Sequence, residues 1–260
     1  MGCKPESYFA YVALSQYLGH GLTRIVWDAL LRWARYLVDH AHLKLTYRAC
    51  SAGKEWEVFV DSSLFNAQEK GSFGGYCARF PGSGVFAWRC FSQRKLGLSS
   101  GAAETIMASH AVHYIYGQRI FAQELGQAAK GPTRLYTDSL STLQGTKMED
   151  VPQEQRYMAA RRAVLRQAVE TKNIDLVSVP TALNLADIFT KPLPTAQFRL
   201  LRDKILGLDS MTEPEECVQF VELRGGRLDV RTGTGSGMHA NAGEIVSRGQ
   251  DTQHQTLAVD

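Results

Sequence analysis

"EWEVFVDSS", residues 55–63, is the stretch that decides the fold. Its apolar and polar residues alternate, which is the period-two pattern of a β-strand, and an aspartate, Asp61, stands near its end. "GSFGGYCARF" (71–80), the turn "PGSG" (81–84) and "VFAWRCF" (85–91) come next. Together these segments predict a meander of three antiparallel strands.

Alternating helices and strands follow the meander. Residues 101–125 have helical composition, "TRLYTDS" (133–139) predicts a strand that again ends in an aspartate, and 154–172 form an arginine-rich helical segment. "IDLVSVP" (174–180) predicts the last strand, and 184–191 and 195–208 the last two helices. Strands first and β–α units afterwards predict an α/β fold with a mixed sheet and helices on its faces.

The two ends of the chain differ from this body. Residues 7–40 repeat apolar residues at helical spacing, and "LKLTYRA" (43–49) predicts a short strand. Residues 209–260 are rich in Gly, Thr and Ser without periodicity, which predicts a mostly disordered tail with a weak hairpin at 217–230. We therefore expect a helical segment at 1–42, the α/β domain at 43–208 and the tail at 209–260.

Composition narrows the class of protein. No apolar run approaches the ~18 residues of a membrane span, so we expect no membrane partner. The five cysteines contain no C-x-x-C pair, which argues against a disulfide framework or zinc site and predicts a reducing, intracellular compartment. Residues 1–208 hold 25 basic and 17 acidic residues, whereas 209–260 hold 4 and 9. A basic body fits a polyanionic partner, or simply a solvated lysine–arginine surface.

Four acids stand at the ends of these predicted elements: Asp61, Glu104, Asp138 and Asp187. Each has an ordinary local alternative: an Asx turn for Asp61, an N-cap for Asp138 and a capping box with Asn184 for Asp187. Glu104 is predicted in the first turn of its helix, where the helix dipole stabilises any acid. Together they can converge at the carboxyl edge of one sheet. Carboxylates without His or Cys favour Mg²⁺ or Mn²⁺, and two such ions can clamp a phosphodiester.

Asp187 raises a question of its own. It lies in "NLADIFTKPLP" (184–194), among apolar residues and before Lys191 and two prolines. Either it caps a helix, or it pairs with a positively charged group.

Several motifs carry a family resemblance. The order strand-Asp61, helix-Glu104, strand-Asp138, helix-Asp187 resembles the ribonuclease H fold with its D-E-D-D set. The stretch 177–208, with "LADIFTKPL" at its centre, looks like the end of a copia-type retrotransposon Pol polyprotein. "LSSGAAET" (98–105) is similar to that family's LSSTEAEY, and "LYTDSLS" (135–141) to its YCDNQSA. "WDALLRWARYL" (27–37) with "LKLTY" resembles the segment that joins the family's reverse transcriptase thumb to its ribonuclease H domain, so 1–42 is expected to be a remnant of it.

The resemblance implies hydrolysis of the RNA strand of an RNA–DNA hybrid, with two Mg²⁺ or Mn²⁺ ions. It implies that Asp61 bridges both ions, that Glu104 and Asp138 complete the two sites, and that Asp187 positions the second ion. Glu104 is also expected to sense the RNA 2′-OH. A metal-activated water would attack the phosphorus in line and leave 3′-hydroxyl and 5′-phosphate ends. The implied partners are the hybrid and the polymerase part of the same Pol, with no small-molecule substrate.

The chain departs from the family pattern at three places. "VDSSLF" stands where the family usually has SDADWA, and Ala102 replaces the first glutamate of LSSTEAEY. Tyr157 falls where the family usually has a histidine, which predicts slower turnover if that histidine helps product release or proton transfer. None of the three removes a proposed metal ligand.

Other polar residues have two interpretations each. Ser99 and Ser100 can contact a nucleic-acid backbone or cap a helix, and Arg156, Arg161 and Arg162 can track phosphates or form a solvated face. His110 and His113 lack a third metal ligand, and Trp56 and Trp88 favour packing over base stacking.

Three competing functions are weighed against ribonuclease H. A catalytically weak or inactive retroelement-derived module that only binds nucleic acid is the main alternative. An integrase shares the fold but needs a final glutamate and often a zinc module, neither of which is seen. Polymerase activity lacks its Tyr-x-Asp-Asp motif in this chain.

Overall fold

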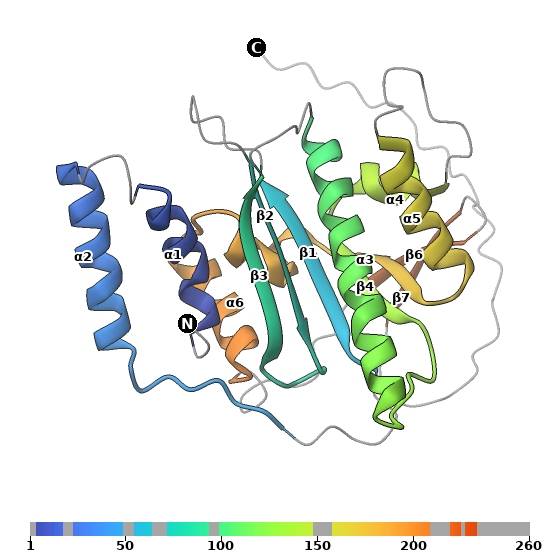
Figure 1. Cartoon of the computed structure of the whole chain (residues 1–260), viewed down its shortest axis with the longest axis horizontal. Coiled ribbons are helices and arrows are strands. Elements are labelled where there is room, and N and C mark those ends of the chain that lie inside the picture. The colour runs from blue at the N-terminus through green and yellow to red at the C-terminus, as the bar shows by residue number, and fades with distance from the viewer. Residues whose placement is uncertain are drawn as a thin grey trace, which may run out of the picture.

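The computed structural model describes residues 4–17, 23–48, 55–63, 72–93, 99–147, 158–208, 219–224 and 227–232 (Figure 1). Its main sheet has the strand order β3-β2-β1-β4-β5. The strands are β1 (Glu57–Ser63), β2 (Ser72–Arg79), β3 (Val85–Gln93), β4 (Thr133–Thr137) and β5 (Ile174–Ser178). β1 to β3 form the predicted antiparallel meander, and β4 and β5 continue the sheet in parallel with β1. The mixed α/β sheet expected from the sequence is therefore confirmed.

Helices cover both faces of this sheet. They are α3 (Ser100–Glu124), α4 (Leu140–Lys147), α5 (Ala159–Glu170) and α6 (Thr195–Leu206), with the short 3₁₀ helices η3 (Thr181–Leu183) and η4 (Leu185–Phe189) between β5 and α6. Figure 1 shows α3 and α5 on one side of the sheet and α6 on the other. The described helices lie within or beside the predicted segments, except that 184–191 hold only the 3₁₀ helix η4 and α4 adds a short helix after β4.

Alternation along the strands builds two apolar layers. Val58 and Val60 of β1 pack in the layer beneath α3 and α5, whereas Phe59 between them packs in the layer against η4 and α6. Leu135 and Tyr136 of β4 divide in the same way. Successive side chains of a strand point to opposite faces, so a sheet covered on both faces buries all of them.

The N-terminal segment differs from its prediction. The expected helical stretch 7–40 is divided into η1 (Pro5–Ser7), α1 (Tyr8–Ser15) and α2 (Arg24–Asp39), with 18–22 outside the described residues. The predicted strand at 43–49 was wrong for the described residues 43–48, which pair with no strand. Thr46 instead donates its N–H to Leu206 and accepts one from Gly84, so this extended segment bridges α6 and the β2–β3 turn.

Part of the expected tail is described. β6 (Gln219–Arg224) and β7 (Arg227–Thr232) form an antiparallel hairpin, which confirms the predicted hairpin with its second strand ending slightly later. The other residues of 209–260 lie outside the described part, so the domain boundaries at 42 and 208 stay predictions. Within the described ranges, no helix has both the length and the apolar character to cross a membrane. Cys77 and Cys90 are free and buried.

Candidate active site

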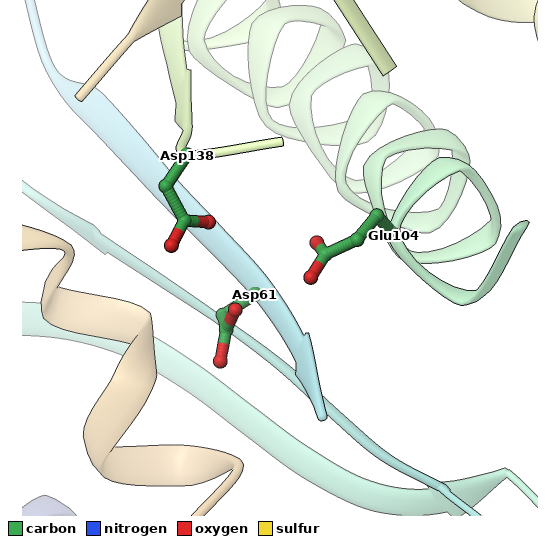
Figure 2. A group of neighbouring side chains, drawn as sticks. All are labelled: Asp61, Glu104 and Asp138. Atoms are coloured by element: carbon green, nitrogen blue, oxygen red, sulfur yellow. The ribbon is translucent and has the colours of Figure 1, made fainter. Parts of the chain in front are cut away.

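Three of the predicted acids come together at one edge of the sheet. Asp61 lies on β1, Glu104 on α3, and Asp138 directly follows β4. One carboxylate oxygen from each lies within 4.8 Å of the others, and Figure 2 shows the three side chains as close neighbours. β1 and β4 are parallel neighbours, so their carboxyl ends meet at this edge, and the first turns of α3 return to it.

Asp61 is part of the strand rather than its end. It pairs with Gly75 in the β1–β2 ladder, and β1 continues to Ser63. Its buried carboxylate accepts a hydrogen bond from the Thr190 hydroxyl and lies 3.7 Å from the Lys191 ammonium. The side chain is therefore held by the segment after η4 and not by an Asx turn.

Glu104 is the acid that burial affects most. It lies in the second turn of α3, so the prediction that it occupies the first turn was wrong. Burial raises the pKa of Glu104 to about 9, and the nearby charges of Asp61 and Asp138 add to this effect. A backbone hydrogen bond from Ser62 holds one side of the carboxyl group, whereas Oε2 is buried and has no hydrogen-bond partner among the described residues.

Asp138 is not the N-cap of the helix that follows it. The hydroxyl of Ser139 accepts the N–H of Thr142 at 3.3 Å, so the next residue performs the capping. Asp138 accepts instead from the amide of Asn184 at 3.2 Å. That amide also donates to the carbonyl of Val60 at 3.1 Å, so the buried Asn184 connects β1, Asp138 and η4.

From the sequence, Asn184 is expected only to cap the helix that follows it. Its side-chain oxygen does accept the N–H of Ala186 at 3.2 Å. The two long-range bonds from its amide have no local signal, because their partners are 46 and 124 positions away.

Asp187 lies beside the three acids and is joined to one of them, Asp61, through a lysine. Its fully buried Oδ1 lies 2.9 Å from the ammonium of Lys191, which in turn reaches Asp61. The expected capping box is absent, because the N–H of Asn184 donates to Thr181. Burial and the charge of Asp61 raise the pKa of Asp187, and Lys191 partly offsets them. The positive charge expected near Asp187 is therefore Lys191.

The predicted nucleic-acid contacts have the following places. Ser99 caps α3 by accepting the N–H of Ala102 at 3.2 Å, and Ser100 is the exposed first residue of that helix. Arg161 donates to the hydroxyl of Ser109 at 3.4 Å, where α5 packs on α3, and Arg162 lies beside α4. Arg156 and Tyr157 lie outside the described residues. A role for these side chains in binding nucleic acid stays a prediction.

The remaining aromatic and histidine side chains pack within the fold. Trp56 is buried in the layer beneath α3, and Trp88 packs against the opposite layer, as predicted. His110 meets the ring of Phe91 edge-on with centroids 5.6 Å apart. His113 bonds through Nδ1 to the carbonyl of Ser109 at 2.7 Å.

The donor set fits a hard divalent cation. Among the described residues it consists of carboxylate oxygens only, and none of these residues gives the buried Oε2 of Glu104 a hydrogen-bond partner, a role that a cation could fill. Three carboxylates this close repel one another unless a cation or a proton compensates them. The raised pKa of Glu104 is what such repulsion and burial produce when no cation is present.

Comparison with known proteins finds sequence relatives for part of the chain. No family model matches the chain. It is 28% identical over 136 residues to the retrovirus-related Pol polyprotein from transposon TNT 1-94 of Nicotiana tabacum. The aligned residues make up 52% of this chain and 10% of that protein. It is 32% identical over 109 residues to the transposon Ty1-NL2 Gag-Pol polyprotein of Saccharomyces cerevisiae, covering 41% of this chain and 6% of that protein. The chain thus spans a tenth or less of the length of these relatives.

Solved structures with similar chains include ribonuclease H domains. The N-terminal RNase H domain of Rv2228c from Mycobacterium tuberculosis has a TM-score of 0.39 and 12% identity, covering 58% of this chain and 97% of that one. RNase H1 from Halobacterium salinarum has a TM-score of 0.38 and 18% identity, covering 52% and 94%. The foamy viral protease-reverse transcriptase in complex with RNA/DNA hybrid has a TM-score of 0.41 and 13% identity, covering 68% and 28%.

The resemblance predicted from the motifs is confirmed in its broad form: the relatives of this chain are retrotransposon Pol polyproteins. The predicted α/β fold with a mixed sheet is confirmed as well. The mixed sheet holds the expected order of strand-Asp61, helix-Glu104 and strand-Asp138, followed by Asp187 on a short helix.

Proposed function

We propose that this chain is the ribonuclease H part of a copia-type retrotransposon Pol polyprotein and hydrolyses the RNA strand of RNA–DNA hybrids. The observation that carries the proposal is the group formed by Asp61, Glu104 and Asp138, with their oxygens within 4.8 Å and Asp187 next to them. Relatedness to retrotransposon Pol polyproteins supports the family, and the "LADIFTKPL" motif supports the copia type.

The residues have distinct roles in this proposal. Asp61 would contribute to both of two Mg²⁺ or Mn²⁺ positions. Glu104 and Asp138 would complete the two positions, and Asp187 would hold the second ion. Such ions, when bound, activate a water and stabilise the leaving oxygen of a phosphodiester. Asn184 fixes the direction of Asp138, and Thr190 fixes that of Asp61. Because β1 is packed on both faces and α3 packs against one of them, these carboxylates need little reorganisation to act.

The substrate is inferred from charge and family. Residues 1–208 carry a basic excess, which suits a polyanion. Ser99 and Ser100 stand exposed at the start of α3, one turn before Glu104, where a nucleic-acid backbone could reach them. Arg161 and Arg162, with Arg156, are proposed to meet phosphates farther from the acids. The polymerase part of the same Pol is the proposed protein partner, and 1–42 the remnant of the segment that joins the two.

The test compares nucleic acids under defined metal conditions. The purified chain is incubated with end-labelled RNA–DNA hybrid, duplex RNA and duplex DNA, in Mg²⁺, Mn²⁺ or EDTA. We expect cutting of the RNA strand of the hybrid only, dependent on metal. Asp138→Asn should lower the rate at least ~100-fold, since it removes one charged ligand from the group.

An exposed acid provides the matched control. Asp39→Asn on α2 makes the same chemical change away from the acids and should cut like the unmodified chain. If hybrid is bound but never cut in either metal, the chain is a binding module without catalysis, the alternative that Tyr157 favours. Cutting that Asp138→Asn leaves unchanged would contradict the proposed site.

A further inference from the structure

Lys191 is the one charged side chain within the acid site that the proposed ribonuclease H activity has not used, among the residues that the structure describes. Its ammonium lies 2.9 Å from Oδ1 of Asp187 and 3.7 Å from Oδ2 of Asp61. Both carboxylates are buried, whereas the lysine side chain is 32% exposed. The lysine thus reaches from the rim of the site onto two of its acids.

The local backbone directs the lysine to this place. η4 ends at Phe189, and the N–H groups of Thr190 and Lys191 both donate to the carbonyl of Asp187. This last turn sets Lys191 four positions after Asp187, the spacing at which two side chains lie on one side of a helical turn. Pro192 follows at once and prevents the helix from continuing.

The ammonium is charged in this setting. Burial by itself lowers the pKa of Lys191, but the carboxylates of Asp61 and Asp187, with a smaller effect from Asp138, outweigh burial and raise it. A single positive charge cannot balance four carboxylates. It does, however, occupy oxygens of Asp61 and Asp187, the pair between which the second ion is expected.

We propose that Lys191 is a resident counter-cation that holds Asp61 and Asp187 in the metal-free protein and exchanges with the second divalent ion. This inference rests on the proposed metal-dependent activity. An ammonium and a divalent ion cannot both occupy the same oxygen of Asp187 at contact distance, because their charges repel strongly there. Lys191 therefore leaves Asp187 when that position binds an ion, and its exposed end turns toward solvent and the substrate.

The exchange makes the two ion positions unequal. The position away from Asp187 carries no ammonium and fills first. The position between Asp61 and Asp187 binds more weakly, because Lys191 must give up its ion pair with each. Lys191 is in this sense a positioning residue: it acts through the carboxylates and sets the affinity of the second position.

Two measurements test the exchange: calorimetric titration with Mn²⁺, and the melting temperature of the protein in EDTA. Lys191→Met keeps the length of the side chain without its charge. It should tighten the weaker Mn²⁺ site about tenfold, equal to about 1.4 kcal/mol, and lower the melting temperature of the metal-free protein. Lys191→Gln should change both in the same direction, and Lys191→Arg should stay near the unmodified chain. Lys44→Met removes an exposed charge at the opposite end of β1 and should change neither.

Two results overturn the inference. One is unchanged or weaker Mn²⁺ binding in both Lys191→Met and Lys191→Gln, which makes the lysine a structural ion pair only. The other is measured on the unmodified protein and decides the matter if the neutral variants do not fold. It is an NMR resonance of the Lys191 Nζ that does not shift as Mg²⁺ saturates the protein.

Hybrid cleavage by the unmodified chain separates the two proposals. If the unmodified chain cleaves the hybrid and the neutral variants bind Mn²⁺ as the unmodified chain does, the ribonuclease proposal stands and the exchange proposal fails. If the unmodified chain cleaves no hybrid but the neutral variants bind Mn²⁺ more tightly, the exchange proposal stands and the ribonuclease proposal fails.

Discussion

At the scale of single residues, Glu104 is where the requirements of stability and of metal binding conflict most. It is buried, and one of its oxygens has no hydrogen-bond partner within the part of the chain that the structure describes. Burial together with Asp61 and Asp138 raises its pKa to about 9. Sites for chemistry are often made of groups whose charge the fold disfavours. Here the disfavoured charge is the one that a divalent cation needs.

This conflict predicts how metal-free stability depends on pH. The pKa of Glu104 in the unfolded chain is near its ordinary value of 4.5, and in the folded chain it is about 9. The folded state therefore holds a proton that the unfolded state loses, so its contribution is complete below pH 4.5 and is lost as pH rises toward about 9. Glu104→Gln removes this loss. In EDTA at pH 8.5 it should raise the free energy of unfolding by more than ~1 kcal/mol, since one pKa unit is about 1.4 kcal/mol.

Urea unfolding at pH 5 and pH 8.5 measures the effect. The gain should be small at pH 5, and hybrid cleavage should be lost at both. Glu124→Gln, at the exposed end of α3, is the matched control and should show no pH-dependent gain. An equal free-energy change for Glu104→Gln at both pH values would mean that the carboxyl group is not held neutral by its surroundings.

At the scale of elements, the contact between β2 and η4 positions Asp187. Gly75 lies opposite Asp61 in the β1–β2 ladder, on the face that η4 covers. A Cβ atom there would lie 2.6 Å from the Cβ of Phe189 and 3.1 Å from the carbonyl of Arg89. Glycine therefore lets η4 approach the strand closely enough to bring Asp187 and Lys191 to Asp61.

Gly75→Ala tests this close approach. Alanine usually suits a strand better than glycine, so without the contact the variant would be neutral or stabilising. With it, we expect a loss of ~1–3 kcal/mol, as for overpacked sites, and weaker Mn²⁺ binding as η4 moves away from β2. Chemical unfolding and calorimetry measure the two effects.

The control for Gly75→Ala is another glycine with open space. Gly117 is exposed in the middle of α3, and nothing lies within 4 Å of its added Cβ. Gly117→Ala should stabilise by ~0.5–1 kcal/mol through helix propensity. Equal stabilisation by both substitutions would contradict the packing argument.

At the scale of the whole molecule, three distant segments meet at Gly207. The extended segment 43–48, the β2–β3 turn and the end of α6 exchange backbone hydrogen bonds there, with Thr46 N to Leu206 O and Gly84 N to Thr46 O both at 2.8 Å. Arg48 also donates to the carbonyl of Gly207 at 3.1 Å. Gly207 ends α6 with φ 71°, and its added Cβ would lie 2.5 Å from both Gly84 N and Thr46 O.

Gly207→Ala should therefore be among the more harmful substitutions outside the site. The left-handed backbone costs a non-glycine residue ~1–2 kcal/mol, and the contact with two backbone atoms adds to this. We expect a total loss of ~3 kcal/mol or more in the free energy of unfolding, measured by chemical denaturation. Because the segment lies at the end of β1 opposite to Asp61, Mn²⁺ affinity of the folded variant should be unchanged.

Gly126 separates the two causes. It has the same φ of 71°, but nothing lies within 4 Å of its added Cβ. Gly126→Ala should lose only the ~1–2 kcal/mol of the backbone conformation. Equal losses for the two alanine variants would show that the junction around Gly207 contributes little.

The sequence by itself determined the elements of the sheet and three of the acids that meet on it. Strand periodicity placed β1 to β5, because a strand covered on one or both faces must repeat its apolar residues along the chain. The place of Asp138 directly after β4 followed from the same pattern, whereas Asp61 lies within β1 and not at its end. The predicted N-cap at Asp138 was wrong because Ser139 caps the helix instead. The predicted capping box of Asp187 was wrong because the N–H of Asn184 donates to the carbonyl of Thr181.

Only the tertiary structure decided how the site is held. Residues 43–48 alternate like a strand, yet their hydrogen-bond partners lie on α6 and a turn, so no ladder forms. The bonds of Asn184 to Val60 and Asp138, and the reach of Lys191 to Asp61, join residues more than 40 positions apart. Local pattern records propensity and burial, but such pairings depend on where the chain returns in space, and no short stretch of sequence contains that information.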